Sequence, residues 1–136
     1  MGIVYAPIIL KNAGDVSNAD RGIISEREIR ETSVTALVDT GAGTLVIDEE
    51  ICQKLGLKIK GLRGAYIANG ERAICKITEP VEIHWKNRQT TFSAVVIPGL
   101  EQVLLGSIPL QDMDLIVHLS KGELVGAHGD EVVMRV

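Results

Sequence analysis

The chain has 136 residues, of which 46% are apolar, and a formal net charge of −4 at pH 7. This length is enough for one domain with a substantial core, over residues 1–136, and too short for two ordinary domains. With this acidic balance we expect neither nucleic acid nor an anionic membrane as a partner. The sequence has no apolar run that approaches the length of a bilayer span and no basic leader, which predicts a cytoplasmic protein.

The first half of the chain predicts short strands separated by polar turns. Runs of β-branched and aliphatic residues predict strands over residues 3–10, 34–38 and 44–47, and the charged residues 26–32 are expected to form an exposed strand that leads into residues 34–38. Between the first two strands we expect a turn at residues 11–15, followed by a polar segment over residues 16–24. Asp48 has the character of a helix N-cap, so a helix of about two turns is expected from there to Leu55, with Gly56 ending it.

The second half continues in the same way. Strands are expected over residues 57–62, 63–68, 72–77, 81–85, 91–97 and 114–118. Asn69-Gly70 is the strongest hairpin signal, because both residue types tolerate the positive φ of a tight turn. A second short helix is expected over residues 107–112, and a terminal hairpin is expected from residues 123–127 and 131–136. Short strands at this spacing favour a small sandwich or barrel over alternating βαβ units.

Asp39 is the residue that most strongly suggests a function. It follows the apolar run from Val34 to Val38 and precedes Thr40-Gly41, so a carboxylate stands where a buried strand meets a tight loop. A carboxylate in such a place must be hydrogen-bonded or paired, because an unpaired buried charge is costly. The plain alternative is an ordinary turn, in which Asp39 binds its own backbone and the glycine supplies positive φ.

A second apolar motif with a glycine lies far downstream, at Val103-Leu104-Leu105-Gly106. Together with the Asp39 motif and the hairpin signal between them, it resembles the pattern of the retropepsin-like aspartic proteases. In that family an apolar strand leads into Asp-Thr-Gly, a flap hairpin follows, and two apolar residues with a glycine lead into a short helix. The resemblance implies a mainly β fold, a closed acid-protease barrel with a flap hairpin and one or two short helices.

The resemblance also implies an aspartic endopeptidase with Asp39 as its catalytic residue. Peptide hydrolysis needs an activated water and a proton donor, and two carboxylates that share one proton supply both. Because the chain holds one Asp-Thr-Gly, the second carboxylate is expected from Asp39 of a second copy, in a symmetric homodimer. The expected substrate is a peptide or protein, and no metal or other cofactor is expected.

Supporting roles follow from the same resemblance. The implied residues are Thr40, Gly41 and Ala42 beside Asp39, then Ala68, Asn69 and Gly70 in the flap, and Leu104, Leu105 and Gly106 beneath the Asp39 loop. Thr40 would hydrogen-bond across the dimer axis, and Gly41 would let the backbone approach the substrate. For the flap residues, an ordinary hairpin turn is an equally good explanation.

Several alternatives stay open at this point. A catalytically silent homodimer of the same fold could serve as a peptide-binding or interaction module, since a fold does not fix a function. Residues 131–136 could pair between subunits or fold back on their own barrel. Cys52 and Cys75 lack the spacing of a metal or redox site, which favours buried free thiols over a disulfide.

Overall fold

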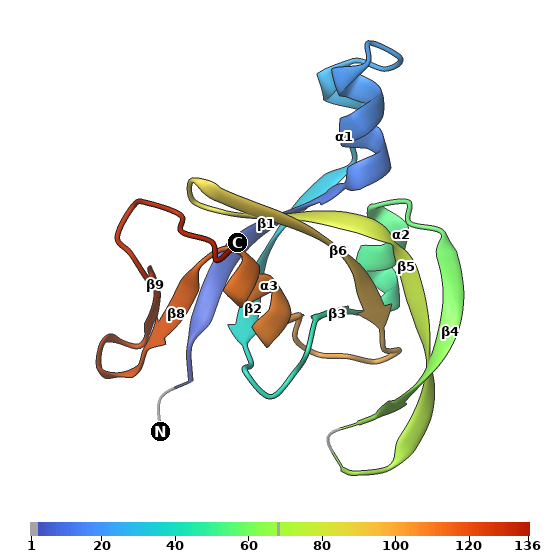
Figure 1. Ribbon diagram of the computed structural model, residues 1–136. Coiled ribbons are helices and arrows are strands. Elements are labelled where there is room, and N and C mark those ends of the chain that lie inside the picture. The colour runs from blue at the N-terminus through green and yellow to red at the C-terminus, as the bar shows by residue number, and fades with distance from the viewer. Residues whose placement is uncertain (1–2, 68) are drawn as a thin grey trace.

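The computed structural model describes residues 3–67 and 69–136 and shows a mainly β protein (Figure 1). The strands are β1 (Tyr5–Asn12), β2 (Glu31–Val38), β3 (Leu45–Ile47), β4 (Ile59–Tyr66), β5 (Arg72–Trp85), β6 (Arg88–Val96), β7 (Leu104–Leu105), β8 (Leu115–His118) and β9 (Glu123–Gly126). The helices are α1 (Ala13–Asp20), α2 (Glu49–Lys54) and α3 (Ser107–Asp112), with 3₁₀ turns at Glu26–Glu28 and Leu119–Lys121. Across the described residues, no helix has the length and apolar character needed to cross a membrane.

One sheet contains seven strands in the order β1-β2-β7-β3-β6-β5-β4. A further pairing between β1 and β5, in which Leu10 lies opposite Ile83, turns this sheet back on itself. The β2–β7 and β3–β6 pairs are parallel, and the other pairs are antiparallel. Strands β8 and β9 form a separate two-stranded sheet. The closed, mainly β architecture that the resemblance implied is therefore confirmed.

The core lies inside this ring, and strand alternation explains how it is filled. Along β1 every second side chain points inward, so Ala6, Ile8 and Leu10 are buried while their neighbours are more exposed. Ile83 and Trp85 face the same interior from β5. Burying one large aliphatic side chain contributes about 1.5–3 kcal/mol, so these inward rows favour folding by several kcal/mol.

The turn expected at residues 11–15 is wrong, because residues 13–20, which include the first part of the polar segment, form α1. The Asn12 side chain caps the helix by accepting a hydrogen bond from the Asp15 N–H (3.0 Å). Helix α1 projects from the body of the molecule (Figure 1) and has no apolar stripe, so its residues show no helical periodicity. The strand expected over residues 26–32 begins only at Glu31, after the 3₁₀ turn.

Two other boundaries differ from expectation because of irregularities within strands. The segments expected as separate strands before the Asn69-Gly70 turn form the single strand β4, with a shift in register after Ile59. The two segments after that turn form the single strand β5, which contains a bulge between Ile77 and Pro80. Proline is tolerated at a bulge because no ladder hydrogen bond is required of it there. Helices α2 and α3 form where they were expected, and the Asp48 side chain caps α2.

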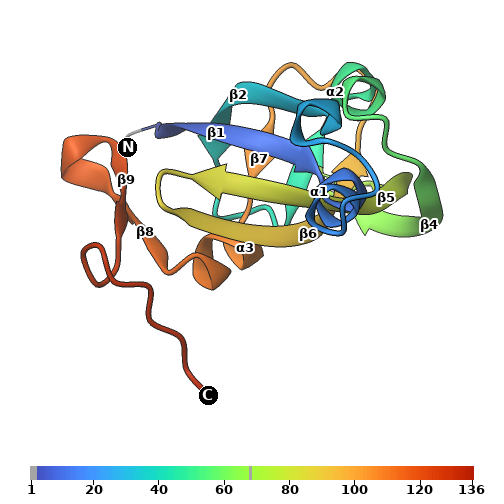
Figure 2. The same cartoon turned by 90° about the horizontal axis from the view of Figure 1, so that it is seen from above.

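The terminal hairpin expected from residues 123–127 and 131–136 is also wrong. Strand β9 pairs with β8 instead, and residues 131–136 form no strand and run away from the sheet (Figure 2).

The buried Arg88 guanidinium donates to the carbonyls of Met113 (2.8 Å) and Asp114 (2.7 Å) and also to that of Gly129. Hydrogen bonds from the Val133 N–H and then from His128 hold the pKa of Asp114 below its usual range.

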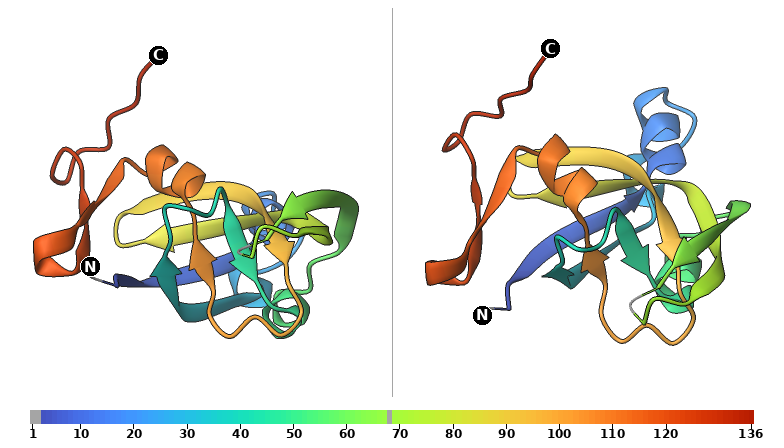
Figure 3. Two further views of the ribbon diagram at one scale, coloured as in Figure 1. Left: turned by 90° about the horizontal axis from the view of Figure 1, so that it is seen from below. Right: turned by 60° about the horizontal axis from the view of Figure 1, so that its bottom comes forward.

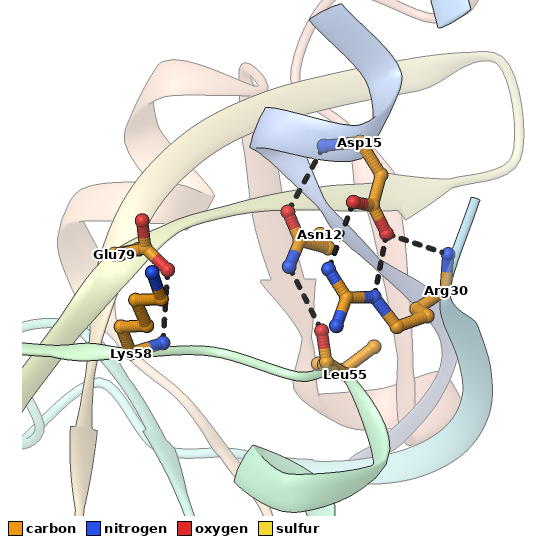
Figure 4. Close-up of polar contacts among 6 residues, drawn as sticks. All are labelled: Asn12, Asp15, Arg30, Leu55, Lys58 and Glu79. Atoms are coloured by element: carbon orange, nitrogen blue, oxygen red, sulfur yellow. Dashed lines mark hydrogen bonds and ion pairs between the residues drawn. The ribbon is translucent and has the colours of Figure 1, made fainter. Parts of the chain in front are cut away.

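A group of polar contacts fixes α1 to the body of the molecule (Figure 4). The Asp15 carboxylate accepts hydrogen bonds from Arg30 Nε (2.8 Å), Nη2 (2.9 Å) and the backbone N–H (3.0 Å). Asn12 Nδ2 donates to the carbonyl of Leu55 (2.9 Å), and the Arg30 side chain covers Gly56 so closely that a Cβ there would clash with it. These contacts join α1 to the end of α2, far from α1 in sequence.

Candidate active site

Asp39 lies directly after β2, at the start of the loop that leads to β3. Its N–H donates to the carbonyl of Leu105 on β7 (3.0 Å), which extends the β2–β7 pairing by one hydrogen bond. Its Oδ1 accepts a hydrogen bond from the Gly41 N–H (2.9 Å), and its carbonyl accepts one from the Ala42 N–H (3.1 Å). The turn favoured by Asp-Thr-Gly therefore forms, and it holds the carboxylate at the end of the strand.

The Asp39 carboxylate is only half-buried. Within residues 3–67 and 69–136, Gly41 supplies its one side-chain hydrogen bond, and no cation forms an ion pair with it. Thr40 and Gly41 are exposed beside it, and Ala42 is half-buried. The loop therefore presents its acidic group to the solvent and leaves it accessible to a second molecule.

The Leu104-Leu105-Gly106 motif lies beneath this loop. Strand β7 is inserted between β2 and β3, so Leu105 pairs with both Val38 and Leu45 and is fully buried. Gly106 leaves no space for a side chain, because a Cβ would lie 2.6 Å from the Ala42 oxygen and closer still to that of Thr44. The structure thus brings this motif into direct contact with the Asp39 loop.

Helix α3 braces the other side of the same loop. The N–H of Ser107, its first residue, donates to the carbonyl of Ala42 (2.8 Å), and the N–H of Ile108 donates to that of Gly43 (3.1 Å). These are N–H groups of the first helical turn, which have no acceptor inside a helix. Because one end of the loop is tied to β7 and the other to α3, the position of Asp39 is set by main-chain hydrogen bonds.

The expected flap is the hairpin between β4 and β5. Asn69 and Gly70 lie at its tip, where Gly70 has a φ of 83° and its N–H donates to the carbonyl of Ile67 (2.8 Å). Asn69 Oδ1 accepts a hydrogen bond from the Glu71 N–H (2.8 Å), and Ala68 lies outside the described residues. The tip and the Asp39 loop lie toward the same lower edge of the molecule, as Figures 1 and 3 show.

A row of side chains on one face of the sheet connects the Asp39 strand with this hairpin. Successive strand pairings place Leu37 opposite Leu104, then Val46, Val95 and Ile77 in turn. Residues directly opposite one another share a face of a sheet, so these five side chains lie in a line. All except Val46 are half-buried, and we call this side of the sheet the cleft face.

The alternate row of the same strands faces the interior. It consists of Val38, Leu105, Leu45 and Ala94, and the last three are fully buried. Sequence reasoning did not identify the cleft face, because its residues differ from the core row only by one position along each strand. Ala94, Val95 and Val96 in β6 are all apolar, so residue type does not distinguish the cleft face from the core row there.

The two cysteines and three histidines lie outside the Asp39 loop. Cys52 and Cys75 are buried free thiols, as expected, and burial raises the pKa of Cys52. His84 contacts Glu82 (2.5 Å) on the outer side of β5, and His128 contacts Asp114 (2.7 Å) near the chain end. Neither pair has a place in the Asp39 loop.

A closed β sheet, an Asp-Thr-Gly loop braced by a Leu-Leu-Gly strand, and a long hairpin at the same edge together define the retropepsin-like class of aspartic proteases. Residues 25–112 match the family described as "gag-polyprotein putative aspartyl protease". This match covers more than half of the chain, so the protein belongs to that family.

Among solved structures, the fold is similar to the crystal structure of the retroviral protease-like domain of Ddi1 from Leishmania major. The two proteins share 16% sequence identity and superpose with a TM-score of 0.55, over 92% of this chain and 88% of that one. At this level of identity the likeness concerns the fold alone. A sequence search of curated proteins finds no match.

Proposed function

We propose that the protein is an aspartic endopeptidase that acts as a homodimer, with Asp39 of both subunits in one shared active site. The observation that carries this proposal is the half-exposed carboxylate at the end of β2, in a chain of an aspartyl protease family. One chain supplies one such carboxylate, whereas this chemistry uses two that share a proton. A two-fold axis beside the loop would bring the two copies together.

In the proposed reaction, one Asp39 is ionised and the other carries the shared proton. The ionised carboxylate accepts a proton from a water molecule as the water oxygen attacks the carbonyl carbon of the peptide. The protonated carboxyl donates its proton to the carbonyl oxygen, which gives a neutral tetrahedral diol. When the diol collapses, the C–N bond breaks, a proton passes to the leaving nitrogen, and the pair again holds one proton.

The peptide would lie extended along the cleft face, between the Asp39 loop and the β4–β5 hairpin. The half-buried apolar residues of that face, such as Leu104 and Val95, offer surfaces for alternate side chains of an extended chain. Closure of the hairpin tip at Asn69-Gly70 would exclude water from the reacting carbonyl. Thr40 is exposed beside Asp39, which is compatible with a contact across the dimer axis.

The proposal is tested by replacing Asp39 with asparagine and comparing cleavage of a peptide library by mass spectrometry. Asp39→Asn should abolish cleavage while it preserves dimerisation and the melting temperature. Asp20→Asn is the matched control, because Asp20 is an exposed carboxylate at the end of α1. This variant should cleave the peptides as the unmodified protein does. A transition-state mimic with a hydroxyl at the scissile position should raise the melting temperature of the unmodified protein.

The alternative function, a silent homodimer that binds peptides, predicts a different result in the same experiment. The unmodified protein would then capture peptides across a broad pH range without turnover. Cleavage by Asp39→Asn at an unchanged rate would remove this residue from the mechanism.

A further inference from the structure

Basic residues are concentrated in the hairpin that borders the cleft face. Residues 57–79 contain Lys58, Lys60, Arg63, Arg72 and Lys76, but only two acidic residues, Glu71 and Glu79. The chain as a whole carries a net charge of −4, so the sign of the charge is reversed in this segment. A local excess of cations beside a cleft attracts anionic ligands.

The strand register divides these cations between the two sides of the hairpin. Arg63 pairs with Cys75, and Cys75 lies two residues before Ile77, so Arg63 is on the cleft face. Lys76 pairs with Leu62 and Arg72 pairs with Tyr66, one position out of step, which places both on the opposite side. The Arg72 guanidinium also lies against Gly64, where a Cβ would be 2.9 Å from its Nε.

Arg63 lines a hollow of about 270 Å³ at the base of the hairpin. The residues around this hollow are Lys60, Gly61, Leu62, Arg63, Ile77 and Ser93. Ser93 connects it to the candidate active site, because the carbonyl of Ser93 accepts a hydrogen bond from Thr44 Oγ1 (3.4 Å). Thr44 ends the loop that begins at Asp39, and Ile77 belongs to the row of residues that defines the cleft face.

The charge in this hollow has no counterpart within the part of the chain that the structure describes. Its lining contains two cations and no carboxylate, and neither Lys60 nor Arg63 forms an ion pair there. The Glu79 side chain accepts a hydrogen bond from the Lys58 N–H (2.9 Å), as Figure 4 shows, and Glu71 lies at the far tip of the hairpin. Lys60 and Arg63 are both exposed, so their ammonium and guanidinium groups are available to a ligand at this hollow.

We propose that this hollow is a substrate subsite that selects an acidic side chain, with Arg63 as the residue that determines specificity. This inference rests on the proposed endopeptidase function and names its substrate class, which is a peptide with Asp or Glu near the cleaved bond. A guanidinium offers two parallel N–H donors that match a carboxylate, Lys60 adds a second positive charge, and Ser93 adds a hydroxyl donor. A homodimer contains the subsite twice.

The first arm of the test measures binding, so that it does not depend on turnover. Octapeptides of alanine and valine carry a neutral dye and one Glu, which is moved through each position, and a second series carries Gln instead. Their affinity for the full-length Asp39→Asn protein is measured by fluorescence anisotropy. We expect Glu to be favoured over Gln by about tenfold at one position or more, and the ratio to fall as salt is raised.

Variants of the hairpin then identify the residue responsible. Arg63→Gln should bring the Glu-to-Gln ratio close to one, and Lys60→Gln should reduce it less. Arg72→Gln is the matched control, since it removes the same charge from the other side of the hairpin and should leave the ratio unchanged. Equal affinity for both series in the parent protein, or a preference that survives in the Arg63→Gln, Lys60→Gln double variant, would overturn the inference.

The second arm repeats the comparison as cleavage by the protein with Asp39 intact. A Glu preference in kcat/KM at the same position, lost in Arg63→Gln, supports both the subsite and the endopeptidase function. A binding preference without any cleavage supports the subsite and contradicts the endopeptidase function. Cleavage of both series at equal rates overturns the subsite and leaves the endopeptidase function standing.

Discussion

Asp15 and Asp39 each follow one of two neighbouring strands, β1 and β2, yet the chain treats the two carboxylates differently. Asp15 is 8% exposed and accepts three hydrogen bonds from Arg30. The Arg30 side chain, and then its backbone N–H, hold the pKa of Asp15 below its usual range despite burial. Asp39 is half-exposed, and its side chain accepts one hydrogen bond, from Gly41, within the described residues.

The difference separates a structural carboxylate from one suited to chemistry. The hydrogen-bonding capacity of Asp15 is used inside the chain, where it fixes α1 to the end of α2 (Figure 4). Asp39 keeps acceptor capacity for a group outside the chain, while β7 and α3 hold its backbone. A loop held by main-chain hydrogen bonds, with an acid that forms no ion pair among the described residues, is the arrangement expected of a preorganised catalytic group.

The largest effect is expected at Asp39. Asp39→Asn should lower kcat/KM for peptide cleavage by about 10³-fold or more, because asparagine can neither accept the proton of water nor share one. Asp15→Asn should keep near-normal kcat/KM at a temperature where it is folded, as measured by initial rates on one fluorogenic peptide. Comparable losses in the two variants would remove the functional distinction between them.

Gly106→Ala should have the largest effect on stability. Its methyl group would lie 2.6 Å from the Ala42 carbonyl oxygen, so the Asp39 loop must move. We expect a loss of about 2–4 kcal/mol in the free energy of unfolding, measured by urea denaturation. Gly43→Ala is the control in the same loop, because a Cβ there meets nothing within 4 Å and should change this free energy little. A neutral Gly106→Ala would show that the loop is not held as described.

Asp15→Asn should have a smaller effect. The hydrogen bonds to Arg30 are short, but the Arg30 side chain is 51% exposed, so solvent screens the interaction. The expected loss is about 1–2 kcal/mol, or a fall of roughly 3–6 °C in Tm by calorimetry. Asp20→Asn, which removes an exposed charge from the same helix, serves as the control.

The difference in Tm between the parent protein and Asp15→Asn should depend on pH. Because the folded-state pKa of Asp15 is lowered, its contribution is present above the unfolded pKa, near 3.9, and is lost as pH falls through the folded value. The Tm gap between the parent and Asp15→Asn should therefore be constant from pH 7 to about pH 5 and then close in stronger acid. A gap that is the same at pH 7 and pH 2.5 would contradict a charge-dependent contact.

The sequence was sufficient for the parts of the site that are local in the chain. Asp39, its turn and the apolar strand before it are contiguous in the sequence. In the Leu104-Leu105-Gly106 motif, two apolar residues directly precede a glycine at a position that has no space for a side chain. The Asn69-Gly70 turn is local in the same sense. Each of these features depends on residues a few positions apart, so residue type and order were enough to locate it.

The remaining features depend on contacts between distant residues. Helix α1 has no apolar periodicity, and Arg30 and Leu55, which contact its Asp15 and its N-cap Asn12, lie outside it in the sequence. The path of the chain near its end depends on Arg88, which donates a hydrogen bond to the carbonyl of the distant Gly129. The side on which Arg63 lies depends on the register of β4 after its shift, and no propensity specifies that register.

The central claim, that one active site uses Asp39 from two chains, is tested most directly by mixing subunits. Unmodified protein and Asp39→Asn are mixed at constant total concentration, allowed to exchange subunits, and assayed for cleavage. If both copies are required, the rate falls as the square of the unmodified fraction, to roughly one quarter in an equal mixture. A rate that falls in direct proportion, to roughly one half, would contradict the account, because each chain would then carry a complete site.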